Sequence, residues 1–91
     1  MTPLEKVASE LARYDHPLLR FSAREQAGAI ELVIELAQPL AGAHIYRAPI
    51  HPRDIDNPQF PWTFQRFLYD CMHDYLVELF ARTPQSREAA L

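Results

Sequence analysis

The spacing of apolar residues near the start of the chain predicts an amphipathic helix. Between residues 4 and 11, apolar side chains recur three or four positions apart and so fall on one side of a helix. Thr2 can cap this helix, Pro3 suits its first position, and Glu5 completes a capping box with Thr2. The helix is expected to end at Asp15-His16-Pro17, because a proline disfavours helical backbone at the residue before it.

Residues 18–36 alternate between apolar and polar positions, which is the pattern of a β-hairpin. A turn at Ala27-Gly28 gives a register with two Arg–Glu pairs on one face and three apolar pairs on the other. The charged pairs are Arg20–Glu35 and Arg24–Glu31, and the apolar pairs are Leu19–Leu36, Phe21–Ile34 and Ala23–Leu32. A slip of one residue would destroy this arrangement. Ala-Gly, however, is not a preferred two-residue hairpin turn.

A third strand is predicted over residues 43–50, after a six-residue connection. Pairing Leu36 with Ala43 would place Ile45 beside Ile34 on the buried face. A connection of this length constrains the register only weakly.

The segment between the sheet and the last helix, residues 49–61, holds four of the eight prolines and is expected to be stiff and extended. Asn57 can cap the helix that follows. That helix should run to about Arg82, where Thr83-Pro84 stops it.

The order of these elements predicts a two-layer α+β fold. It would contain a three-stranded antiparallel sheet with both helices on one face. Residues 1–83 would form a single domain, and residues 84–91 a flexible C-terminal tail.

The last helix is apolar over an arc wider than the roughly 100° stripe of an ordinary surface helix. Either the first helix covers the excess, or its tyrosine hydroxyls simply reach water, or the excess is a subunit interface. We favour the interface, in a two-fold homodimer, with Tyr69, Leu76 and Phe80 as contact residues.

An acidic stripe follows the opposite side of this helix, at Asp70, Asp74 and Glu78. Such a stripe is usually a solvated face. The alternatives are a docking surface for a basic partner or part of a cation site.

Composition narrows the possible functions. The net charge is −3 and no basic patch is visible, so nucleic-acid binding is not expected. The N-terminus does not read as a signal peptide, and no apolar run approaches the roughly 20 residues of a membrane span.

Only Gly28 and Gly42 are available, so no phosphate-cradling loop exists, and we expect no nucleotide or other cofactor. The single cysteine, Cys71, fits a reducing cytoplasmic setting and is expected to be a buried thiol.

Two groups of residues could carry chemistry. His51, Asp54 and Asp56 have side chains that bind zinc and similar metals, although the same residues can stabilise loop turns. On the outer face of the sheet, Glu35 would lie between Arg20 and His44 and could prepare the imidazole as a general base. The same arrangement is also an ordinary exposed network.

The absence of a complete catalytic constellation favours a small, non-catalytic binding or protein-interaction domain that self-associates. A protein partner would contact His44, Tyr46, His51 and Trp62. The alternative is a metal-dependent binder or enzyme that uses His51, Asp54 and Asp56. A third interpretation is an accessory subunit whose partner covers the apolar surface.

Overall fold

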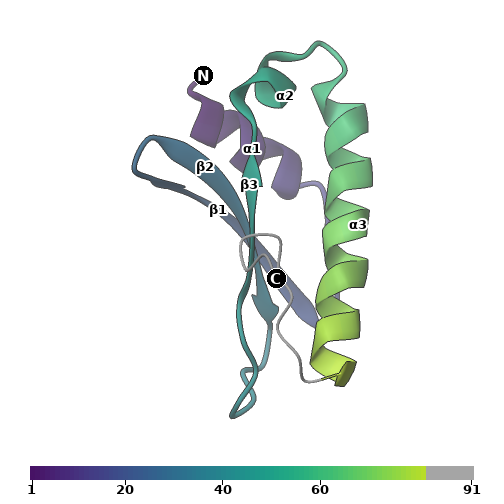
Figure 1. Cartoon of the computed structure of the whole chain (residues 1–91). Coiled ribbons are helices and arrows are strands. Elements are labelled where there is room, and N and C mark those ends of the chain that lie inside the picture. Colours follow the sequence, from purple (N-terminus) through teal and green to yellow (C-terminus); the bar gives the residue numbers. More distant parts are fainter. Residues whose placement is uncertain (82–91) are drawn as a thin grey trace.

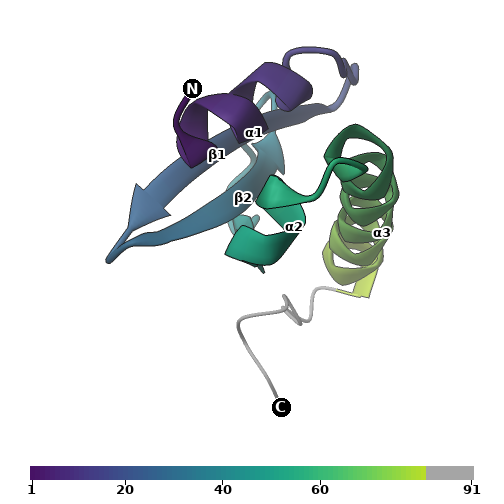
Figure 2. The same cartoon turned by 90° about the horizontal axis from the view of Figure 1, so that it is seen from above.

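A computed structural model describes residues 1–81 as three helices and one three-stranded sheet (Figure 1). The elements are α1 (Pro3–Leu11), β1 (Leu19–Gln26), β2 (Ala29–Leu36), β3 (Tyr46–Ile50), α2 (Pro52–Asp56) and α3 (Phe60–Ala81). The strands are antiparallel in the order β1-β2-β3. All three helices contribute buried side chains to one core on one face of the sheet, and α1 and α3 flank α2 when the molecule is seen from above (Figure 2). The predicted α+β fold is confirmed.

Helix α1 begins with the predicted capping box. The Thr2 hydroxyl accepts a hydrogen bond from the Glu5 backbone N–H at 3.1 Å, and the Glu5 carboxylate accepts one from the Thr2 N–H at 2.8 Å. Hydrogen bonding from Thr2 to the carboxylate, chiefly from the Thr2 backbone N–H, lowers the pKa of Glu5. The helix buries Val7 and Leu11 against the sheet.

The hairpin of β1 and β2 has the predicted register. Arg20 pairs with Glu35 and Arg24 with Glu31, while Phe21 lies opposite Ile34. The two-residue turn is formed by Ala27 and Gly28, with φ angles of 54° and 80°. Positive φ at both central positions is the geometry whose twist matches that of the flanking strands.

Replacing Ala27 with asparagine is expected to raise the free energy of unfolding by about 0.5–1 kcal/mol. The reason is that Ala27 occupies left-handed backbone, in which its Cβ is crowded, whereas asparagine tolerates this region. Urea denaturation of the two proteins measures the difference. Gly28→Ala is the control and should destabilise, since Gly28 also has positive φ. A loss of stability in Ala27→Asn would contradict this explanation of the turn.

The predicted register of the third strand is wrong by one residue. The structure pairs Ile34 with Tyr46, whereas the prediction paired Ile34 with Ile45. As a result Tyr46 is fully buried and Ile45 is 46% exposed. The physical reason is that the predicted register would have turned Arg47 toward the core, opposite Leu32.

The connection after the sheet was predicted to be extended. This prediction is wrong in part, because the connection contains α2. Pro52 occupies the first turn of this helix, and His51 caps it by accepting a hydrogen bond from the Arg53 N–H at 3.0 Å. The helix places Ile55 in the core with 1% of its surface exposed. Asn57 then accepts a hydrogen bond from the Gln59 N–H at 2.8 Å, at the predicted start of the last helix.

Helix α3 buries one side against the sheet. Its buried residues are Phe60, Phe64, Leu68, Cys71, Tyr75 and Glu78. From Phe64 on they recur at alternating steps of four and three. Cys71 is fully buried, as expected. The predicted helix end at Arg82, the domain boundary at residue 83 and the tail at 84–91 lie outside the described residues.

Candidate functional sites

The solvent-facing side of α3 carries a second regular stripe, which we call the outer stripe. Its members follow one another at steps of four, three, four, three and four: Trp62, Arg66, Tyr69, His73, Leu76 and Phe80. All six are exposed. At 100° per residue, the outer stripe lies roughly 160° around the helix from the buried stripe. The helix therefore has two opposite faces at heptad-like spacing, and the sheet covers only one of them.

The outer stripe is unusually apolar for a solvent-facing surface. Nine large hydrophobic residues of the described chain are exposed, and five lie on this helix: Trp62, Tyr69, Leu76, Val77 and Phe80. Phe80 is 94% exposed and Trp62 is 63% exposed. Toward the end of the helix, His73, Leu76, Val77 and Phe80 line a surface cavity of about 410 Å³. An exposed apolar group such as Leu76, Val77 and Phe80 is typical of an interaction surface.

A second site lies at the same end of α3 but on its buried side. Glu78 is only 3% exposed, and its Oε1 lies 2.6 Å from Nε2 of His44. His44 belongs to the connection that leads into β3. The Tyr75 hydroxyl donates a hydrogen bond to the His44 carbonyl oxygen at 2.6 Å, and the two rings meet edge to face at 5.2 Å. These contacts fix His44 against the helix.

The surroundings of this pair are acidic. Burial raises the pKa of Tyr75, and the negative charges of Glu35 and Glu78 raise it further. One turn before Glu78, the Asp74 carboxylate accepts a hydrogen bond from the Tyr46 hydroxyl at 3.3 Å.

The predicted acidic stripe is therefore not a solvated face. Only Asp70 is exposed, while Asp74 is half-buried and Glu78 is buried. The cause is the connection before β3, which brings His44 against this side of α3. His44 accordingly pairs with Glu78, and its predicted pairing with Glu35 is wrong.

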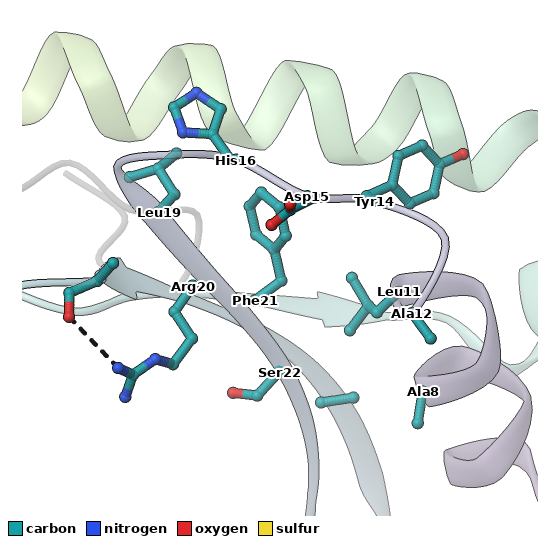
Figure 3. A pocket seen from close by; sticks show the side chains of 12 residues that line it. Ala8, Leu11, Ala12, Tyr14, Asp15, His16, Leu19, Arg20, Phe21 and Ser22 are labelled. Carbon is teal, nitrogen blue, oxygen red and sulfur yellow. Dashed lines mark hydrogen bonds between the residues drawn. The ribbon is translucent and has the colours of Figure 1, made fainter.

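A cavity of about 620 Å³ lies between the end of α1, residues 14–16 and β1 (Figure 3). The Phe21 ring points from β1 toward the segment that carries Asp15 and His16 (Figure 3). The polar groups at the rim of this cavity make local hydrogen bonds. His16 accepts a hydrogen bond from the Leu18 N–H at 3.0 Å, and the Arg20 guanidinium donates one to the Ala37 carbonyl at 3.3 Å. This geometry supports the loop and does not define a reaction.

The four predicted partner-binding residues do not form one surface. Tyr46 is buried in the core, so its predicted role as an exposed anchor is wrong. His51 caps α2. Trp62 is exposed at the start of α3, whereas His44 pairs with Glu78 near its end, about 24 Å farther along the helix.

The predicted metal ligands are not brought together. Within residues 1–81, no group of three or more His, Cys, Asp or Glu side chains is placed to hold a metal ion. Nδ1 of His51 is occupied by the cap of α2, and Ile55 turns into the core between Asp54 and Asp56.

Comparisons with protein-family models, with curated proteins and with solved structures found no match for the chain. Of the helices in residues 1–81, none combines the length and the apolar character needed to cross a membrane. A function can therefore be proposed only from the chemistry of the two sites on α3.

Proposed function

We propose that the protein is a small, non-catalytic protein-interaction domain that self-associates as a homodimer through the outer stripe of α3. The observation that carries this proposal is the regular run of exposed side chains from Trp62 to Phe80. Burial of such a stripe against a second helix is the main driving force of helix–helix association.

A second copy of the same helix is a suitable occupant because the stripe is complementary to itself when reversed. In a two-fold antiparallel arrangement centred near Cys71, the positions that meet are Trp62 with Phe80, Arg66 with Leu76, and Tyr69 with His73. Aromatic rings would then pack at both ends of the interface. In a parallel arrangement, Arg66 would instead face its own copy and like charges would repel. The stripe spans about 27 Å.

The cysteine content bears on the compartment, and the arrangement of the candidate metal ligands bears on the alternative function. One cysteine in 91 residues supports the reducing environment of the cytoplasm, which is the location we propose. The arrangement of His51, Asp54 and Asp56 provides no observation in favour of a metal-dependent binder.

Light scattering over a hundredfold concentration range tests the homodimer. The expected mass is twice the 10.5 kDa of one chain. Phe80→Asp should weaken the dimer by at least about thirtyfold, because it places a carboxylate at the end of the interface. Since Phe80 is 94% exposed, the monomer should keep its helical circular dichroism.

Leu18→Asp is the matched control. Leu18 is a leucine 62% exposed on the segment before β1, away from the outer stripe, and its replacement should leave the mass unchanged. A wild-type mass of 10.5 kDa at every concentration would refute the proposal.

A further inference from the structure

The Glu78 carboxylate is only half satisfied. Its Oε1 contacts His44 at 2.6 Å, whereas its Oε2 is buried and has no hydrogen-bond partner among residues 1–81. Leaving a buried acceptor without a donor costs stability, more so when the group is charged. Such a group calls for a donor, and residues 1–81 do not supply one.

A cavity of about 510 Å³ adjoins this carboxylate. Its lining consists of Glu78 and His44 together with small and apolar residues: Leu36, Leu40, Ala41, Gly42, Ala43 and Leu79. The volume falls within the range of small-molecule sites, and a few polar groups in an apolar wall are their usual composition. The cavity is distinct from the outer stripe, because Glu78 belongs to the buried side of α3.

We propose that this cavity binds a small organic cation, a primary ammonium or guanidinium group on a short apolar chain. The N–H groups of the cation would donate to Oε2 of Glu78, and the chain would pack against Leu36, Leu40 and Leu79.

Charge favours a cation over an anion at this position. Glu35 and Asp74 lie close to the Tyr75–Glu78 end of the helix and add negative potential, of which Arg20, 3.7 Å from Glu35, offsets a part. A metal ion is a poorer match, since no third metal-binding side chain joins His44 and Glu78 within the described residues.

Entry of the ligand requires a local movement. Oε2 is shielded from water, so a ligand that reaches it must displace part of the cavity rim. Leu40, Ala41 and Gly42 line the cavity, are exposed, and belong to the connection between β2 and β3. Their displacement would leave the strand pairing intact.

The test is calorimetric titration of the wild-type protein with n-hexylammonium chloride and, separately, with 1-hexanol. The two probes share a chain and differ in charge. Hexylammonium is expected to bind at least about tenfold more tightly than hexanol. Equal affinities, or no heat from hexylammonium up to about 10 mM, would overturn the proposal.

Two variants locate the binding. Glu78→Gln should weaken hexylammonium binding by at least about tenfold and leave hexanol binding unchanged. Asp70→Asn removes an exposed carboxylate from the same helix and should change neither affinity more than about twofold. Loss of affinity in Asp70→Asn equal to that in Glu78→Gln would show only diffuse charge attraction and would overturn the assignment. If Glu78→Gln fails to fold, the comparison of hexylammonium with hexanol on the wild-type protein still tests the proposal. Neither titration depends on whether the protein forms a homodimer.

Discussion

Replacing Tyr46 with alanine is expected to lower the free energy of unfolding by about 3–5 kcal/mol. Tyr46 is fully buried opposite Ile34, and its ring lies 5.9 Å from that of Tyr75. The substitution removes most of a large aromatic side chain from the core and also removes the hydrogen bond to Asp74. Urea denaturation followed by circular dichroism, at one fixed protein concentration, measures the loss.

The neighbouring residue supplies the control. Ile45 is 46% exposed and precedes β3, so Ile45→Ala should cost less than about 1 kcal/mol. The difference between the two variants reports the register of β3 directly, because a slip of one residue exchanges the buried and exposed positions. A larger loss for Ile45→Ala than for Tyr46→Ala would mean that the register in which Ile45 is buried is the true one.

The parts of the fold that were predictable from sequence are those fixed by local constraints. The capping box of α1 requires only that Thr2 and Glu5 stand three residues apart. In the hairpin, a two-residue turn leaves little freedom, and the Arg20–Glu35 and Arg24–Glu31 pairs agree with one register only.

The register of β3 failed because its constraints are weaker. Nine residues separate β2 from β3, and β3 is only five residues long. A usable signal was nevertheless present. Tyr46, Ala48 and Ile50 alternate with Arg47 and Pro49, and the polar and proline positions mark the outward face.

In helix α3, the spacing of apolar residues predicted the exposed apolar surface correctly but not the burial of Glu78. The apolar spacing correctly indicated more hydrophobic surface than the sheet covers, and Tyr69, Leu76 and Phe80 are indeed exposed in the single chain. The same spacing assigned Glu78 to a solvated face. Its burial depends on His44, 34 residues earlier, and no local pattern reports a contact across that distance.

The second large effect is expected at that contact. His44→Ala should lower the free energy of unfolding by about 3 kcal/mol, because it leaves the Glu78 carboxylate, 3% exposed, with no partner among residues 1–81 on either oxygen. The value is at the low end for a buried pair, since the His44 side chain is itself 21% exposed. Urea denaturation again provides the measurement.

A double variant shows whether the loss in free energy of unfolding arises from the Glu78 carboxylate that has lost its partner. Adding Glu78→Leu to His44→Ala should recover more than half of the loss, because an apolar side chain of similar size has no buried charge to satisfy. Arg20→Ala is the control for an exposed pair: Arg20 and Glu35 lie 3.7 Å apart near the surface, and breaking them should cost less than about 1 kcal/mol. If the double variant is less stable than His44→Ala, Glu78 contributes stabilising contacts beyond its pairing with His44. In that case the Oε2 of Glu78, which has no partner among residues 1–81, would not lower the stability of the ligand-free protein and would no longer support the presence of a ligand.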